Sequence, residues 1–352
     1  MSAQRKDEHV RLAESLRDER RPNGFDDVAF LHDALAAIDV DAVDASASVL
    51  GSAWPQPFYI NAMTGGTDRT RRINAALARS AAVAGVAIAV GSQSVALADP
   101  AREDGFRVVR AEAPDAFVFA NVGPTATPEQ ACRAVEMLSA DALQVHVNPA
   151  QELVMPEGDR TFSGWTDRIA AIVAAVPVPV LVKEVGFGMA RRSILALSRI
   201  GAAAVDVSGA GGTNFIDIEN HRRARSEYGY LAGWGQSTAF CLIEALHTGT
   251  PVPVEVVASG GVRTPLDVVR ALALGAHAVG VSGHFLHTLL ADGEQALVAE
   301  LRSWADQVRT LLALLGCADL TTLRRRPVLV TGRTRELAEL RGADLAQLAQ
   351  RG

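Results

Sequence analysis

The sequence predicts an α/β fold, a (β/α)8 TIM barrel. Eight short apolar runs alternate with helical patterns between residues 58 and 281, and each run is followed by a glycine-rich or polar loop. Most of the runs are apolar on both sides of the pleat, as strands buried on both faces are. Eight β/α units in series form a parallel sheet that closes into a barrel.

The order of elements follows from these runs. Strands are expected at residues 58–61, 86–90, 117–121, 142–146, 180–184, 204–207, 255–259 and 278–281. Thr127 and Thr264 are each followed by a proline, which is typical of a helix start. A doubly wound open sheet is the alternative, but no G-x-G-x-x-G string opens the first helix.

The chain of 352 residues is expected to form a single domain. Its expected parts are an N-terminal extension over residues 1–57, the barrel over 58–290, and a C-terminal helical segment and tail over 291–352. The charged residues 11–21 predict a solvated helix, and an amphipathic pattern predicts a helix over 295–315. Residues 341–352 are expected to be a frayed tail.

The composition predicts a soluble cytoplasmic protein. A net charge of −6 argues against nucleic acid as a partner, because nucleic-acid binders present clustered basic surface. Cys132, Cys241 and Cys317 are widely spaced, which fits a reducing compartment. The first residues lack the apolar core of a signal peptide, and the longest apolar stretch, residues 170–182, is too short to span a bilayer. We therefore expect no membrane partner.

Glycine and polar residues follow the strands, where barrels of this class carry their active sites. Gly260, Gly261 and Gly283 follow the last two strands, and glycines let backbone N–H groups approach a phosphate at the next helix start. The alternative is that they only make tight turns. Their position in the barrel favours a phosphate site.

Lys183 ends an otherwise apolar strand, where an unpaired ammonium group is costly to bury. It either pairs with a nearby carboxylate such as Glu184 or faces a cofactor. Side chains at the ends of barrel strands tend to be functional, which favours the cofactor.

The loop after the fourth strand contains His146, Asn148, Gln151 and Glu152. Neutral hydrogen-bonding groups beside one carboxylate suit a substrate together with Mg²⁺, which keeps water ligands and takes others from substrate phosphates. From spacing alone, Glu152 serves equally well as a loop-stabilising acid, and a lone histidine is more often a core residue than a catalyst.

Several strings, in order along the chain, resemble type 2 isopentenyl diphosphate isomerases. They extend from RKDEH at residues 5–9 to VTG at 330–332, nearly the whole chain. The most specific strings are NAMTGG at residues 61–66, the loop from His146 through MPEG at 155–158, VKEVGFG at 182–188, GGTNF at 211–215 and IEN at 218–220. Any one of them could arise by chance, but all of them in this order indicate the family.

The resemblance implies an enzyme that interconverts isopentenyl and dimethylallyl diphosphate by a 1,3-allylic proton shift. It implies reduced FMN as the acid/base cofactor, NADPH as reductant, Mg²⁺ to anchor the diphosphate, and a homo-oligomer such as a tetramer or octamer. The residues implied to bind FMN are Ala62, Met63, Thr64, Ser92, Asn121, Lys183, Ser208, Thr213, Gly260, Gly261, Arg263, Ser282 and Gly283.

On the substrate side, the resemblance gives a role to Arg5, Lys6 and His9, which composition alone would assign to a solvated tail. Those implied to bind substrate are Arg5, Lys6, His9, Ser92, Gln93, Ser94 and Gln151. Those implied to be catalytic are Gln151, His146 and Asn148, and Glu152 is the implied Mg²⁺ ligand.

Two positions depart from the family pattern. Ser94 stands where many relatives carry an arginine, and Ala210 replaces an arginine that is common before the Gly-Gly-Thr string. The alternative function is an FMN-dependent oxidoreductase on the same barrel, of the 2-hydroxy acid oxidase kind. That chemistry needs a histidine base and an arginine near the sixth and seventh loops, and residues 208–214 contain neither. A non-catalytic flavin binder would leave Gln151 and Glu152 without a role.

Overall fold

The structure, a computed structural model, describes residues 3–18 and 20–352. Its centre is a closed barrel of eight parallel strands in the order β10-β11-β4-β5-β6-β7-β8-β9. These strands are β4 (Phe58–Ile60), β5 (Ala87–Ala89), β6 (Val118–Val122), β7 (Ala142–His146), β8 (Val180–Lys183), β9 (Ala204–Asp206), β10 (Glu255–Ser259) and β11 (Val279–Val281). The predicted barrel is confirmed, and each strand lies within one residue of its expected range.

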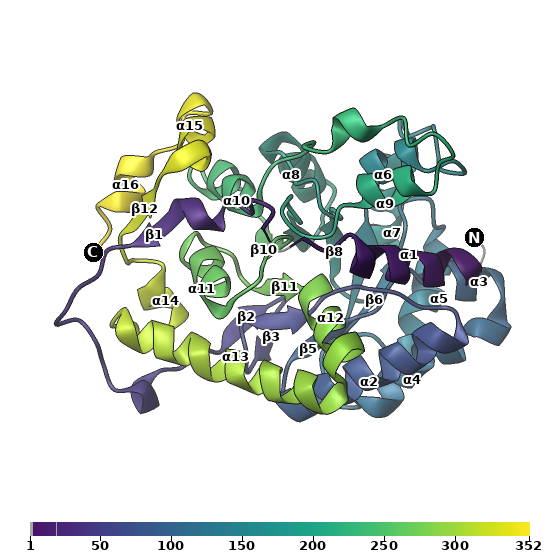
Figure 1. Cartoon of the computed structure of the whole chain (residues 1–352), viewed down its shortest axis with the longest axis horizontal. Coiled ribbons are helices and arrows are strands. Elements are labelled where there is room, and N and C mark those ends of the chain that lie inside the picture. The colour runs from purple at the N-terminus through teal and green to yellow at the C-terminus, as the bar shows by residue number, and fades with distance from the viewer. Residues whose placement is uncertain (1–2, 19) are drawn as a thin grey trace.

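Helices surround the barrel (Figure 1). They are α2 (Asp68–Ala84), α3 (Ser94–Ala98), α4 (Asp104–Glu112), α5 (Pro128–Leu138), α6 (Pro149–Val154), α7 (Trp165–Ala175), α8 (Arg191–Arg199), α9 (Phe215–His221), α10 (Thr238–Leu246), α11 (Pro265–Ala273), α12 (Gly283–Asp292), α13 (Glu294–Leu314), α14 (Leu320–Leu323), α15 (Gly332–Leu340) and α16 (Leu345–Ala349). Short 3-10 turns are η1 (Phe25–Asp27), η2 (Val40–Ala42), η3 (Pro100–Arg102) and η4 (Gly229–Leu231).

Local sequence accounts for several helix boundaries. Thr127 caps α5 and Thr264 caps α11, because each hydroxyl accepts the backbone N–H three residues on, from Gln130 at 3.2 Å and from Asp267 at 3.3 Å. Both predicted starts are confirmed. The amphipathic helix expected over residues 295–315 is α13.

The N-terminal extension adds strands that were not predicted. They are β1 (Val28–Phe30), β2 (Ala47–Val49) and β3 (Ser52–Trp54), with β12 (Val328–Val330) in the C-terminal segment. β1 pairs antiparallel with β12, so that the two ends of the chain share one small sheet, while β2 and β3 form a hairpin. Trp54 of the hairpin is buried, with its ring centroid 5.5 Å from that of Tyr59 in the barrel. Strands of three residues are too short to show a readable alternation.

Two expectations for the chain ends are wrong. Helix α1 (Ala3–Ser15) is not a solvated helix over residues 11–21: it contacts α2, α9 and α12 at the barrel mouth (Figure 1), and Val10 is buried. Residues 341–352 are not a frayed tail, because Leu348 of α16 is fully buried and Arg351 Nη1 donates to the Ala273 carbonyl at 3.0 Å. In both places apolar side chains are covered by segments far away in sequence.

Among the residues described, no helix is both long enough and apolar enough to cross a membrane.

Candidate active site

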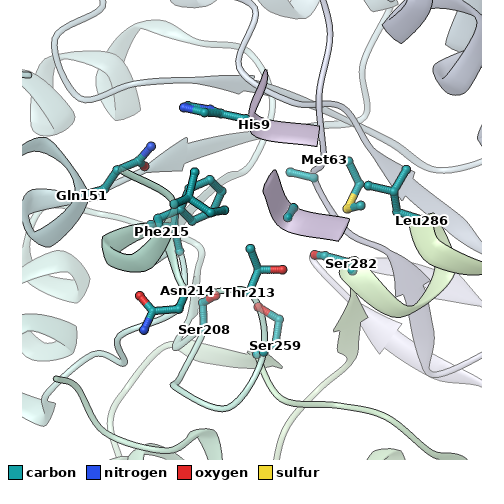
Figure 2. A pocket seen from close by; sticks show the side chains of 18 of the residues that line it. His9, Met63, Gln151, Ser208, Thr213, Asn214, Phe215, Ser259, Ser282 and Leu286 are labelled. Atoms are coloured by element: carbon teal, nitrogen blue, oxygen red, sulfur yellow. The ribbon is translucent and has the colours of Figure 1, made fainter. Parts of the chain in front are cut away.

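A pocket opens where the barrel strands end, and α1 forms part of its wall. Figure 2 shows His9, Gln151 and Phe215 on one side of it, with Met63 and Leu286 facing them from the other. Two polar side chains, with the aromatic ring of Phe215 beside them, therefore lie across the pocket from the apolar side chains of Met63 and Leu286. This end of the barrel is where enzymes of the fold place their chemistry.

All the predicted site residues except Gln93 and Ser94 line this pocket. They are Arg5, Lys6, His9, Ala62, Met63, Thr64, Ser92, Asn121, His146, Asn148, Gln151, Glu152, Lys183, Ser208, Thr213, Gly260, Gly261, Arg263, Ser282 and Gly283. The closed barrel brings them together because all eight strands run in the same direction and end at one rim.

The structure corrects the expectation that Gln93 contacts the substrate. Its side chain is fully buried and points into the wall: Nε2 donates to the Ala134 carbonyl of α5 at 3.0 Å, and Oε1 accepts from Asn121 N at 2.8 Å. These contacts use both ends of the amide to join the loop after β5 to helix α5 and strand β6. Ser94 does not line the pocket either; the Ser92 hydroxyl, which does, donates to Ser94 Oγ at 3.3 Å.

The loops after β9 and β10 form a glycine-rich surface. Gly260 and Gly261 have φ of +88° and +74°, a region that side chains with a Cβ rarely adopt. A Cβ on Gly260 would lie 2.0 Å from Gly209 O, and one on Gly212 would lie 2.9 Å from Gly261 N. Only glycines permit this close approach of two backbones. Gly283 begins α12 on the same pocket wall, and backbone N–H groups at a helix start favour a phosphate.

Two further groups test whether this wall suits a polar cofactor such as FMN. The buried hydroxyl of Thr64 has no hydrogen-bond partner among the residues described, which is unusual for a polar group removed from water. Arg263, by contrast, lines the pocket but donates to the Gly211 carbonyl at 2.9 Å and to the Arg21 carbonyl, so that it supports the loop.

Lys183 is buried at the end of β8 and lines the pocket, with Nζ donating to the Glu184 carbonyl at 2.7 Å. Burial lowers the pKa of Lys183, and the carboxylates of Asp206 and Glu184 oppose that change. The Glu184 carboxylate itself accepts the backbone N–H groups of residues 185–187 at 2.7–2.9 Å. Its hydrogen bonds thus go to the following loop, while the Lys183 ammonium group stays at the pocket.

The loop after β7 presents a connected set of polar side chains. His146 Nδ1 lies 2.8 Å from Asn121 Oδ1, an acceptor, so Nδ1 carries the proton and Nε2 is left as an acceptor. Burial, and then the charges of Lys183 and Lys6, lower the pKa of His146 to about 3. His146 is therefore a neutral residue at physiological pH. This environment distinguishes it from an exposed histidine, whose pKa is about 6.5.

Asn148 holds the side chains of Gln151 and Glu152 in place through hydrogen bonds. Asn148 Nδ2 donates to Gln151 Oε1 and to Glu152 Oε1, both at 3.0 Å, and Glu152 Oε2 accepts from Asp159 N at 2.8 Å. No cluster of three or more histidine, cysteine, aspartate or glutamate side chains suited to a metal occurs in the described ranges. A divalent ion at Glu152 would need ligands from water and substrate, which is how Mg²⁺ is commonly held.

Glu219 is a residue that the sequence reasoning missed. It is fully buried, and its Oε1 accepts from Gln151 Nε2 at 2.9 Å and lies 3.0 Å from His9 Nε2. Burial raises the pKa of Glu219, but His9, Gln151 and Arg222 together outweigh it, and the pKa is lowered. Glu219 thus orients two predicted site residues. The string at residues 218–220 marked the family without indicating this role.

Helix α1 brings its basic residues to the pocket. Arg5 is largely buried, and its Nη1 donates to Glu157 Oε1 at 3.2 Å and to Met155 Sδ at 3.1 Å. Burial, and then the charge of Arg5, lower the pKa of Lys6 to about 8. The basic cluster is therefore part of the pocket wall and not a solvated tail.

Comparison with known proteins decides the family. The isopentenyl-diphosphate delta-isomerase of Streptomyces sp. (strain CL190) is 51% identical to this chain, over 99% of this chain and 96% of the relative. Those of Nocardia farcinica and Latilactobacillus sakei are 49% and 46% identical, over 100% and 98% of this chain and 96% and 98% of theirs. The chain belongs to the isopentenyl-diphosphate delta-isomerase family. It is thus an enzyme of the isomerase class, as its sequence motifs predicted.

A family model described as FMN-dependent dehydrogenase also matches, over residues 119–330, which span most of the barrel. Among solved structures, a mutant flavocytochrome b2 with benzoylformate matches with a TM-score of 0.66 and 19% identity, over 93% of this chain and 86% of that one. A mandelate oxidase variant with 2-hydroxy-phenylacetamide matches with a TM-score of 0.63 and 18% identity, over 93% and 98% of the two chains. At such identities the structural matches bear on the fold alone.

Proposed function

We propose that this protein interconverts isopentenyl diphosphate and dimethylallyl diphosphate by a 1,3-allylic proton shift, with reduced FMN as acid/base cofactor and Mg²⁺ anchoring the diphosphate. One observation carries the proposal. The glycine surface and Lys183 open onto the same pocket as a separate polar set from α1 and α6. Such a pocket offers different partners to a cofactor phosphate and to a substrate diphosphate. Membership of the isomerase family supplies the substrate.

The residues present fit FMN. Gly260, Gly261 and Gly283 would bind the phosphate of FMN. The buried Thr64 hydroxyl would gain a hydrogen-bond partner from FMN, and Lys183 would place a positive charge beside the flavin ring. The other residues proposed to hold FMN are Ala62, Met63, Ser92, Asn121, Ser208, Thr213 and Ser282, with Arg263 supporting the loop. Reduced FMN, when bound, supplies acid/base groups for carbon that the side chains of the pocket do not.

The protein residues position the substrate. Arg5, Lys6 and His9 would bind the diphosphate, and Glu152 would hold the Mg²⁺ that neutralises it. Gln151 is held at both ends of its amide, by Asn148 and by Glu219, and would orient the hydrocarbon end. His146 and Asn148 complete the polar wall as neutral hydrogen-bonding groups. Fixed groups of this kind lower the barrier by holding the reacting atoms in place.

A 2-hydroxy acid oxidase activity is the other candidate, because mandelate oxidase and flavocytochrome b2 share this fold. The chain offers less for that chemistry. Residues 208–214 after β9 contain neither histidine nor arginine, and Arg263 after β10 is occupied by backbone carbonyls. A neutral hydrocarbon chain also suits the apolar side formed by Met63 and Leu286.

The deciding experiment is an anaerobic assay with isopentenyl diphosphate, FMN and Mg²⁺, in which dimethylallyl diphosphate is followed with and without a reductant. We expect turnover only when the flavin is reduced. Equal turnover with oxidised flavin, or by the flavin-free protein, would contradict the proposal. Oxidation of a 2-hydroxy acid by the same sample would support the other candidate.

Four further points stay predictions from sequence and family resemblance. They are the use of NADPH as reductant, a homo-oligomer of four or more subunits, a cytoplasmic location, and a single domain with the boundaries given above.

A further inference from the structure

Arg222 joins three segments around the pocket although it does not line the pocket itself. It follows α9 directly, and only 14% of its side chain is exposed. Nε donates to Glu8 Oε2 of α1 at 3.1 Å, Nη2 to Glu157 Oε1 after α6 at 2.7 Å, and Nη1 to Glu219 Oε2 of α9 at 2.5 Å. One guanidinium group thus binds carboxylates from three segments, of which α1 and the loop after α6 are distant in sequence.

Each of these carboxylates is connected to residues proposed to bind substrate. Glu219 contacts Gln151 and His9 through its other oxygen. Glu157 shares its Oε1 between Arg222 and Arg5, at 2.7 and 3.2 Å. Glu8 lies on α1, the helix that also carries Arg5 and His9. Arg222 is therefore linked to the substrate side of the pocket at three separate points.

We propose that Arg222 is a positioning residue of this site, which holds α1, the loop after α6 and α9 together and so sets the places of Gln151, His9 and Arg5. Its kinetic consequences rest on the proposed function, but its structural ones do not. Arg222 is not among the residues that line the pocket. It acts through the carboxylates that it binds.

The chemistry of the side chain explains why an arginine stands here. A guanidinium group offers five N–H donors in a rigid plane, so it can bind three carboxylates in different directions at once. A lysine carries the same charge on a compact group and would keep only part of this set. Loss of the charge would leave the fully buried Glu219 with His9 as its only basic partner among the described side chains that contact it. Breaking a buried pair in this way is costly.

The Glu8 and Glu219 contacts of Arg222 should have different effects on KM and kcat. The Glu8 contact supports only α1, so its loss should weaken diphosphate binding and raise KM. The Glu219 contact supports Gln151, so its loss should lower kcat as well. We therefore expect Glu8→Gln to raise KM with kcat unchanged, and Arg222→Gln to change both, with kcat/KM lower by about 10- to 100-fold for lost charged hydrogen bonds.

The kinetic test uses the FMN-loaded protein and four variants. Arg222→Lys should recover part of the loss caused by Arg222→Gln, because it restores the charge. The matched control is Arg79→Gln: Arg79 also binds two carboxylates from different elements, Glu112 and Glu294, but does not line the pocket. We expect the control to keep kcat/KM within about twofold of the parent, because a charge pair away from the pocket rarely affects the residues that line it. For the same reason we expect all variants to keep their affinity for FMN.

Hydrogen exchange supplies a readout that does not depend on turnover. In substrate-free, FMN-loaded protein, the backbone amides of residues 3–15 should exchange faster in Arg222→Gln and in Glu8→Gln than in the parent. Their exchange rate in Arg79→Gln should equal that of the parent. If the parent fails to isomerise the substrate, the proposed function is wrong, and this exchange measurement alone decides whether Arg222 holds α1.

The inference is overturned if Arg222→Gln leaves kcat/KM and the exchange of α1 at parental values, or if Arg79→Gln reproduces its effects. Should Arg222→Gln not fold, Glu8→Gln and Arg222→Lys decide the question. Parental KM and parental exchange in both of these variants would also overturn it.

Discussion

Lys183 and Asp206 are register partners on the adjacent parallel strands β8 and β9, so a buried ammonium group and a fully buried carboxylate lie side by side in the barrel. The carboxylate of Asp206 also accepts from Ser259 Oγ at 2.8 Å, from Asn61 Nδ2 at 3.0 Å and from Ser208 N at 3.0 Å. Burial raises the pKa of Asp206 and lowers the pKa of Lys183, and the attraction between the two groups opposes both changes and so favours the charged pair.

This pair predicts non-additive losses of stability. Lys183→Met and Asp206→Asn should each destabilise the FMN-free protein, because each leaves the other charge buried without its counter-charge. The double variant should cost less than the sum by about 1–3 kcal/mol in the free energy of unfolding, measured by urea denaturation. The control combines Lys183→Met with Glu244→Gln, whose partner is Arg341, and should be additive. Additive losses in both pairs would show that Lys183 and Asp206 are not coupled.

The glycine surface predicts a selective effect of one methyl group. A Cβ on Gly283 would lie 3.1 Å from Thr213 Oγ1, a side chain that can move, and Gly283 is not among the glycines with positive φ. Gly283→Ala should therefore leave the thermal stability of the FMN-free protein unchanged or slightly higher, since alanine favours helix. Titration with FMN should show weaker binding because the methyl group occupies the proposed phosphate site. Unchanged affinity would place the phosphate elsewhere.

The proposed metal site rests on Glu152. Glu152→Gln should raise the Mg²⁺ concentration needed for half-maximal activity by about 10-fold or more, as one charged contact is lost, while FMN stays bound. Glu227→Gln is the control, because Glu227 pairs with Arg223 and does not line the pocket. A Mg²⁺ titration identical to that of the parent would return Glu152 to the structural role that its contacts with Asn148 and Asp159 also allow.

Lys6 predicts a pH dependence. Its pKa lies at about 8, so the ammonium group loses its proton as the pH rises through that value, and its attraction for a diphosphate is lost. The profile of kcat/KM, which reports the free enzyme, should fall above about pH 8. Lys6→Arg should abolish this fall, because a guanidinium group stays charged. His146, with a pKa of about 3, should add no step near neutral pH. A fall that persists in Lys6→Arg would assign it to another group.

The sequence by itself determined the barrel and most of the pocket. The strands could be predicted because burial on both faces leaves a continuous apolar run, and two helix starts because their capping residues are local. In a parallel barrel, the residues that follow the strands must meet at one rim. Correct strand positions therefore suffice to place Lys183, Gly260 and Gln151 in one pocket.

Only the tertiary structure decided where individual side chains point and which distant segments cover the rim. Gln93 belongs to the same loop as Ser92, yet its amide turns into the wall to bind Ala134. Glu219 became part of the site because α1 and α6 bring His9 and Gln151 to it. Such contacts join residues separated by many tens of positions, and a local pattern of apolar and polar residues carries no information about which distant surface will bury them.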